Sequence, residues 1–177
     1  GLLTMLFMTY LSGGNPPLFM DFRKVWEAWE IKELAQKLNG KNDAAADHGV
    51  TCFLFDWYWH NTGPFLERAL DRGFLQATNR NRIKFALMWA NHDWFDIQGY
   101  NPGDKVKLLY PGKVTPATWD KITDLVIARY FKHPSYWKID GKPYFSIYEM
   151  SLFLENFGSV EDARAALDGF RQKAKAA

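Results

Sequence analysis

Three stretches of the sequence place acidic, amide, imidazole and aromatic side chains directly after apolar runs. They are Asp56-Trp57-Tyr58-Trp59-His60, Trp89-Ala90-Asn91-His92-Asp93-Trp94 and Tyr148-Glu149. Carboxylate, amide and imidazole groups form hydrogen bonds with hydroxyls, and aromatic rings stack on apolar CH faces. Because a sugar ring offers both kinds of surface, these residue types in this grouping favour carbohydrate binding.

Asp56 and Glu149 are the candidate catalytic residues, because glycoside cleavage uses two carboxyl groups and these two lie late in predicted strands. The candidate substrate-binding residues carry hydrogen-bonding or ring side chains at the same strand ends: Tyr58, Trp59, His60, Trp89, Asn91, His92, Asp93, Trp94 and Tyr148. Structural alternatives stay open. The carboxylates could be held by backbone amides or an arginine, and the histidines could cap helices or bond within loops.

Composition and motifs narrow the classes of ligand. Net charge is +2 and no basic block stands out, so no nucleic-acid partner is predicted. His60, His92 and Asp93 lack a tight ligand spacing such as H-E-x-x-H, so no metal site is expected. No P-loop, dinucleotide-binding or serine-hydrolase motif is present, so no cofactor is expected. Aromatic residues make up 17% of the chain, which fits a ring-rich core as well as a carbohydrate cleft.

Location stays open on sequence grounds. The apolar run at residues 2–11 is too short to span a bilayer, so no membrane span is predicted. Cys52 is the single cysteine, which excludes an internal disulfide framework but does not decide the compartment. A secreted or periplasmic hydrolase and a cytoplasmic transferase are both compatible with these features.

Strands and helices are expected to alternate along most of the chain. Apolar runs predict strands at 51–59, 83–90 and 144–150, and helical periodicity predicts helices at 64–77, 115–131 and 159–175. Upstream, the pattern predicts a strand or buried helix at 2–10, a break at 12–17, a helix at 21–38, a turn at 39–42 and a further helical turn at 43–48.

This alternation predicts an α/β fold with three to four parallel strands joined by crossover helices. Parallel pairing would bring the three polar strand ends together at one mouth. A full (β/α)8 barrel takes about 250 residues, so the 177 residues are expected to form either a small open sheet or a partial TIM barrel. We expect the partial barrel, with residues 1–42 as a leader containing a helix and residues 43–177 as the barrel segment.

Four segments in this order resemble the glycoside hydrolase family 99-like domain, which also goes under the name WbsX-like glycosyltransferase. They are Gly49-Val50 with the following FLFDWYWH, GPFLERAL from Gly63, KFALMWANHDW from Lys84, and HPSYWKIDGKPYFSIYEM from His133. The resemblance runs from about Ala44 to the end of the chain. It implies a (β/α)8 barrel that acts on an oligosaccharide or polysaccharide.

The same resemblance implies a retaining, endo-α-mannosidase-type cleavage through a 1,2-anhydro sugar. In that family the two catalytic glutamates lie in a later Asn-Glu-Trp-type segment, which this sequence does not contain. The chain is therefore expected to be an N-terminal part of the barrel, with the remainder of the barrel as its partner. Two other functions stay open: sugar transfer in polysaccharide assembly, and a non-catalytic carbohydrate-binding scaffold.

Overall fold

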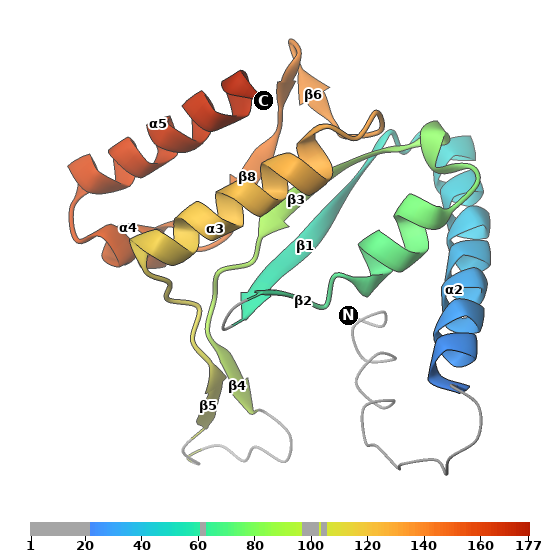
Figure 1. Cartoon of the computed structure of the whole chain (residues 1–177), viewed down its shortest axis with the longest axis horizontal. Helices are drawn as coiled ribbons and strands as arrows, with labels where there is room; N and C mark the ends of the chain where they lie inside the picture. Colours follow the sequence, from blue (N-terminus) through green and yellow to red (C-terminus); the bar gives the residue numbers. More distant parts are fainter. Residues whose placement is uncertain (1–21, 61–62, 97–102, 104–105) are drawn as a thin grey trace. The chain divides into compact units, whose positions relative to one another are not determined.

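Figure 1 shows the computed structural model of the chain, which describes residues 22–60, 63–96, 103 and 106–177. The chain divides into two units, 1–30 and 31–177. Among the described residues, the first unit contributes the start of helix α2, and the second unit carries the features below. The elements predicted at 2–10 and 12–17 lie outside the described residues.

A small sheet with three parallel strands lies at the centre of the second unit (Figure 1). Strand β1 (Cys52–His60) pairs in parallel with β3 (Lys84–Trp89), and β3 pairs in parallel with β8 (Phe145–Ile147). A short strand, β2 (Gly63–Phe65), adds to the outer edge of β1 in the antiparallel direction, which gives the order β2-β1-β3-β8. The predicted parallel α/β arrangement is confirmed.

Helical segments connect and flank these strands. They are α2 (Phe22–Asp47), the π-helical turn η1 (Ala69–Gly73), the 3-10 turns η2 (Phe74–Gln76) and η3 (Arg80–Arg82), α3 (Pro116–Val126) with its π-helical continuation η4 (Ile127–Phe131), α4 (Met150–Phe157) and α5 (Val160–Ala176). Two small hairpins complete the fold: β4 (Trp94–Asp96) with β5 (Lys107–Tyr110), and β6 (Lys138–Ile139) with β7 (Lys142–Pro143).

Local sequence explains where the later helices begin. The Thr115 hydroxyl accepts a hydrogen bond from the Thr118 backbone N–H at 3.2 Å, and Pro116 occupies the first turn of α3. The Ser159 hydroxyl likewise accepts from the Asp162 N–H at 3.0 Å at the start of α5. Both helix starts agree with the sequence prediction. None of the helices that the structure describes combines the length and hydrophobicity that crossing a bilayer requires.

One face of the sheet carries the hydrophobic core. Strand alternation and register put six residues on this face, and each contacts a ring from a helical segment or from another strand of the face: Phe53, Phe55, Trp57, Phe85, Trp89 and Phe145. For example, Trp89 lies 5.3 Å from Trp119 of α3 between ring centroids, and Phe145 lies 5.3 Å from Phe170 of α5.

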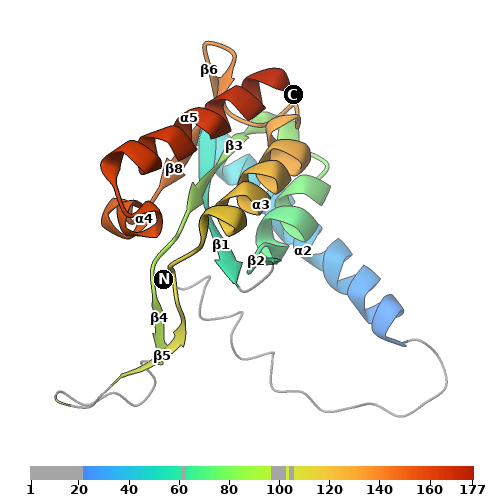
Figure 2. The ribbon, with the colours of Figure 1, turned by 60° about the vertical axis from the view of Figure 1, so that its left-hand side comes forward.

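The opposite face of the sheet is exposed along β1 and just after β8, whereas Ala86 of β3 is buried there. Leu54 is 48% exposed, its neighbour on the same face, Asp56, is also exposed, and Tyr148 is 59% exposed. Figures 1 and 2 show α3 and α5 lying over the same side of the strands. A parallel sheet covered by helices on one face is compatible with a segment of a barrel.

A tyrosine hydroxyl completes the hydrogen bonding between β3 and β8. The segment at Ser135–Trp137 pairs with β3 around Phe85 before β8 begins. There the buried Tyr136 hydroxyl accepts a hydrogen bond from the Leu87 backbone N–H at 3.3 Å and donates one to the Tyr144 carbonyl at 2.6 Å. Burial raises the pKa of Tyr136, so this hydroxyl keeps its proton.

Three sequence predictions about elements were wrong. The turn predicted at 39–42 lies inside the continuous helix α2, because Asn39 and Asn42 bond to another segment instead of turning the chain. The Asn42 side-chain N–H donates to the Asn79 side-chain oxygen at 3.0 Å, and the Asn79 side-chain N–H donates to the Asn39 carbonyl at 2.8 Å. These tertiary bonds use the polar groups that indicated a turn.

The other two errors concern the segments after β1 and β8. The helix predicted at 64–77 is replaced by β2 and two short irregular helical turns; Leu66 has a φ of 58°, which interrupts any α-helix. Pro64 fits β2 because this is an edge strand. The strand predicted at 144–150 is shorter, since α4 already begins at Met150.

Candidate functional site

The carboxyl ends of β1, β3 and β8 meet at one edge of the sheet. In the register, Asp56 lies beside Met88 and Met88 beside Ser146. At Trp89, the residue after Met88, the backbone carbonyl accepts a hydrogen bond from the Tyr148 backbone N–H at 3.0 Å. The polar stretches that follow these strands therefore converge, as the sequence predicts.

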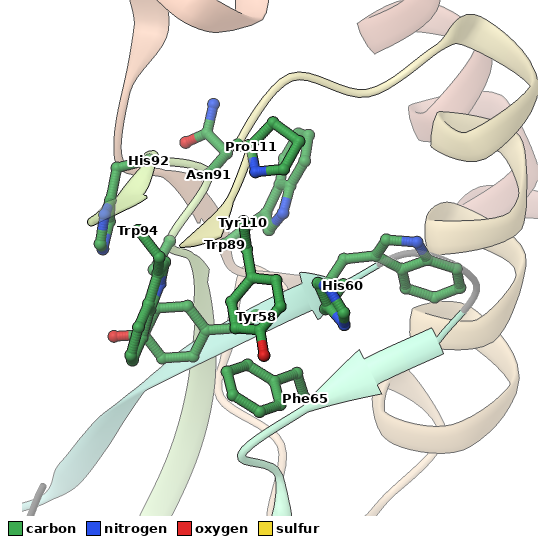
Figure 3. A pocket seen from close by; sticks show the side chains of 12 residues that line it. Tyr58, His60, Phe65, Trp89, Asn91, His92, Trp94, Tyr110 and Pro111 are labelled. Atoms are coloured by element: carbon green, nitrogen blue, oxygen red, sulfur yellow. The ribbon is translucent and has the colours of Figure 1, made fainter. Parts of the chain in front are cut away.

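Seven aromatic or imidazole rings gather at this edge. We call this set the strand-end ring cluster: Tyr58, His60, Phe65, His92, Trp94, Tyr110 and Tyr148. Figure 3 shows His92 and Trp94 side by side, with Tyr58 directed at them. The His92 and Trp94 rings are stacked at 6.1 Å, and Tyr58 meets Trp94 edge-on at 5.2 Å.

The rings pack closely and leave little empty space. The cavity among them has a volume of about 10 Å³, which is close to the lower limit for holding one water molecule. A sugar ring therefore does not fit inside the cluster. Any sugar that binds here lies over its outer side, where Tyr148 is 59% exposed.

Asp56 is exposed on the open face, two residues before Tyr58 on the same side of β1. Burial raises the pKa of Tyr58, and the Asp56 carboxylate and the Tyr148 hydroxyl raise it further. In the register, Asp56 lies beside Met88, and Met88 lies beside Ser146, two residues before Tyr148. The strand ends thus offer a carboxylate and two phenol hydroxyls, groups that suit hydrogen bonding to sugar hydroxyls.

Glu149 lies where β8 gives way to α4. Its carboxylate accepts a hydrogen bond from the Ser151 hydroxyl, and its side chain is partly buried. Asp93 is exposed and accepts a hydrogen bond from the Gly112 backbone N–H at 2.8 Å, so it also fixes the base of the β4–β5 hairpin. One ring nitrogen of His92, Nδ1, lies 3.0 Å from the Asp93 carbonyl.

Trp89, a predicted substrate-binding residue, lies on the helix-covered face of the sheet. It was expected to stack on a sugar, but it is 1% exposed and points into the core, where it contacts Trp119 and Phe153. At 1% exposure the ring has almost no free surface, although it is one of the residues that line the small cavity. The register explains the difference, since Trp89 lies beside the buried Trp57 on the helix-covered face.

Asn91 holds two strand ends together and has no open surface for a ligand. It is 1% exposed. Its side-chain N–H donates to the Glu149 carbonyl at 2.8 Å, and its side-chain oxygen accepts from the Glu149 N–H at 2.7 Å. The amide thus replaces a backbone partner just beyond the end of β3, and it fixes the position of the Glu149 backbone.

The remaining predicted residues divide between the two faces. His60 belongs to the ring cluster, where its centroid lies 3.9 Å from that of Tyr110. Trp59 is half-buried, contacts Trp57 at 5.9 Å and packs against the core. The structure therefore brings Asp56, Tyr58 and His60 together on one side of β1, with Trp59 on the other.

Two members of the cluster were missed from sequence. The sequence predicts a helix over Phe65, and Tyr110 lies within the stretch between Trp94 and Thr115 for which it predicts only a long polar loop. Tyr110 is the register partner of Trp94 in the β4–β5 hairpin, and Phe65 is the partner of Tyr58. Strand pairing therefore places Phe65 and Tyr110 in the ring cluster. The one sequence signal for this was the short run Lys107–Tyr110, which is typical of a strand. Within the described residues, no group of three or more histidine, cysteine or acidic side chains is arranged to hold a metal ion.

Comparison with known proteins identifies the family. The family model described as "Glycosyltransferase WbsX" matches residues 30–176, which include every element of the parallel sheet and the whole ring cluster. The comparisons with curated proteins and with solved structures gave no match. The match confirms the resemblance to the glycoside hydrolase 99-like group that the sequence segments indicate. It covers most of the chain, and the protein therefore belongs to the WbsX glycosyltransferase family.

Proposed function

We propose that this chain binds a glycan over the strand-end ring cluster and acts on it with Asp56 and Glu149 as the acid–base carboxylates. The observation that carries the proposal is the exposed carboxylate of Asp56 on the same face of β1 as Tyr58, at the edge where three parallel strand ends meet and Tyr148 is exposed. Family membership supports a carbohydrate-related function. The carboxyl ends of parallel strands are also where ligands bind in α/β folds.

In this proposal the substrate-binding residues are those that keep an outward surface. Tyr148 and the stacked His92 and Trp94 provide ring faces or edges. Tyr58, His60 and Asp93 provide hydrogen-bonding groups. The chemistry that we assign is retaining glycoside hydrolysis of the endo-α-mannosidase type, in which two carboxyl groups flank the scissile bond.

The fold that goes with this function is a segment of a (β/α)8 barrel. Helices cover one face of the parallel sheet, and the open face carries Leu54 and Asp56. In a barrel that open face would turn inward and the strand ends would form the mouth of the active site. The singly covered sheet supports this arrangement, since doubly wound folds carry helices on both faces.

The test is Asp56→Asn, compared with Asp168→Asn, a matched change on the exposed surface of α5. Release of reducing ends from linear α-linked mannooligosaccharides would measure turnover, and titration calorimetry would measure affinity. We expect Asp56→Asn to lower turnover by about 10²–10⁴-fold, the usual contribution of an acid–base group. Unchanged turnover in a variant with an unchanged melting temperature removes Asp56 from the site.

Sugar transfer is the second candidate, and the description of the matching family favours it. Thermal shift with separate ligands distinguishes the two reactions. A nucleotide-sugar that raises the melting temperature supports transfer, whereas an α-mannooligosaccharide that raises it supports hydrolysis.

A non-catalytic carbohydrate-binding scaffold is the third candidate, and the small cavity of about 10 Å³ favours it. Affinity for the oligosaccharide without any turnover would support the scaffold and exclude the hydrolase. Measurable turnover by the 177-residue chain would exclude the scaffold.

A further inference from the structure

The β4–β5 hairpin carries a concentration of exposed apolar side chains. Ten large hydrophobic residues among those described are exposed, and four of them lie on this hairpin. We call these four the ribbon patch: Phe95 (43% exposed), Val106 (41%), Leu108 (44%) and Leu109 (41%). Figures 1 and 2 both show β4 and β5 extending away from the parallel sheet.

The ribbon patch does not stabilise the hydrophobic core. None of its four side chains belongs to the core or packs against it. The hairpin is fixed at its base instead, where Trp94 and Tyr110 join the ring cluster. A Cβ on Gly112 would come within 2.6 Å of the Asn91 carbonyl oxygen, so the returning chain runs directly against the end of β3. The apolar residues beyond this anchor therefore need another explanation.

The hairpin is amphipathic across its two faces. Phe95 and Leu108 are register partners and share one face, with Val106 two residues before Leu108. Leu109 lies at the irregularity of this ladder, between the Phe95–Leu108 and Trp94–Tyr110 pairs. Asp96 and Lys107 are also register partners and carry opposite charges on the other face. An apolar face backed by a balanced charge pair suits the boundary between water and an apolar phase.

The chemistry of the patch distinguishes lipid from other occupants. Three of the four side chains are branched aliphatics, and the single ring of Phe95 has no hydrogen-bonding group beside it in the patch, so the patch does not suit a sugar. Side chains of this size have areas of about 150–250 Å², so the four expose on the order of 300 Å² in all. A stable protein interface needs about 800 Å² from each partner. A bilayer requires no such matched area, because partition scales with apolar surface alone.

We propose that the β4–β5 hairpin docks on the surface of a lipid bilayer through the ribbon patch. Because its base is part of the strand-end ring cluster, docking holds the candidate site close to the membrane surface. Among the described residues of the hairpin and its base, the exposed charges balance, with Asp93 and Asp96 against Lys107 and Lys113. Binding therefore depends on apolar contact and does not need anionic lipid. This inference stands independently of the proposed glycan chemistry.

Flotation of the full chain with phosphatidylcholine vesicles tests the proposal. We compare the wild type with a ribbon variant, Phe95→Ser with Leu108→Ser and Leu109→Ser. The matched control is Ile139→Ser with Val160→Ser, which removes side chains of 49% and 54% exposure elsewhere. We expect the vesicle-bound fraction of the ribbon variant to be at least fivefold lower than that of the wild type. The control variant should keep the wild-type fraction. Binding should change little between 0.1 and 0.5 M salt, because apolar contact is not screened.

Three results would overturn the proposal. The first is a wild type that does not float with vesicles, and the second is an equal loss in the control variant. The third is concentration-dependent self-association that the ribbon variant abolishes in the absence of lipid, which would assign the patch to a protein partner. Circular dichroism and the melting temperature establish that each variant is folded before these comparisons are made.

Discussion

Trp89 and Asn91 lie at and just after the end of β3, and they have different structural roles. Trp89 is buried in the core, and Asn91 holds the backbone of Glu149 through two hydrogen bonds of 2.7 and 2.8 Å. Each of the two is 1% exposed. The chemistry of the proposed site therefore depends on Asn91 indirectly, because the amide sets the position of the Glu149 backbone.

Substituting Asn91 tests this positioning role. Asn91→Leu leaves the N–H and C=O of Glu149 without their partners, which should cost about 2–4 kcal/mol of unfolding free energy. Asn91→Asp keeps an acceptor for the Glu149 N–H, but its carboxylate repels the Glu149 carbonyl. The protonated acid can donate to that carbonyl, so the folded state favours the proton and the aspartate variant regains stability as pH falls.

Urea unfolding at pH 7 and pH 5 measures this difference, always relative to wild type at the same pH. We expect the deficit of Asn91→Asp to shrink at pH 5 and the deficit of Asn91→Leu to stay constant. A deficit of Asn91→Asp that is equal at both values would show that the amide does not donate to the Glu149 carbonyl.

Sequence reasoning at the residue scale found the convergence but not the orientation of each side chain. Polar groups after three apolar runs predict a common mouth, and the register of β1, β3 and β8 confirms that the strand ends meet. Alternation separates the residues of a strand into two sets. Alternation alone does not match the two sets of residues in β3 to the two faces of β1. That depends on the register, which places Trp89 beside Trp57 and hence in the core.

At the scale of elements, the turn between η4 and β6 depends on a neutral histidine. The Ser135 backbone N–H donates to His133 Nδ1 at 3.1 Å, so this nitrogen must be free of a proton. Burial lowers the pKa of His133, and the positive charges of Arg80 and Lys84 lower it further. The folded state therefore binds this proton less readily than the unfolded state does.

The consequence is a loss of stability in mild acid. The contribution of His133 is fully present above the unfolded pKa of 6.5 and is lost as pH falls from there through the lower folded pKa. Chemical unfolding between pH 7.5 and 5.5 should show a decreasing free energy of unfolding. His133→Asn keeps an acceptor but does not titrate, so its profile should be flatter. As a control, His48→Asn, at an exposed helix end, should keep the wild-type slope.

Element boundaries could be predicted where the signal is local. Thr115 and Ser159 cap their helices as expected, because a hydroxyl before a helix bonds to a nearby backbone N–H. The segments at 39–42 and 64–77 could not be predicted, because their structure depends on distant partners. Asn79 bonds to Asn39 and Asn42 from a different part of the chain, and Pro64 pairs with Trp59 on β1.

At the scale of the whole molecule, the two faces of the sheet should contribute unequally to stability. Leu87 is fully buried on the helix-covered face, whereas Leu54 is 48% exposed on the open face. Leu87→Ala should therefore lower the free energy of unfolding by about 2–5 kcal/mol. Leu54→Ala should lower it by less than about 1 kcal/mol. Denaturant titration of both variants measures the contrast, and similar losses would show that the Leu54 face is also packed.

The hydroxyl of Tyr136 is a single group through which the stability of the sheet can be changed. Leu87 and Tyr144 are joined through this one oxygen atom, so Tyr136→Phe removes a bridge between two strands without changing the size of the ring. Amide hydrogen exchange would then accelerate at Leu87 and leave Lys84, whose N–H bonds to the Thr51 carbonyl, at its original rate. Unchanged exchange at Leu87 would show that the phenol is dispensable there. The rigidity of the strand end that carries Tyr148 and Glu149 would thus be adjustable by one atom, about ten residues away along the chain.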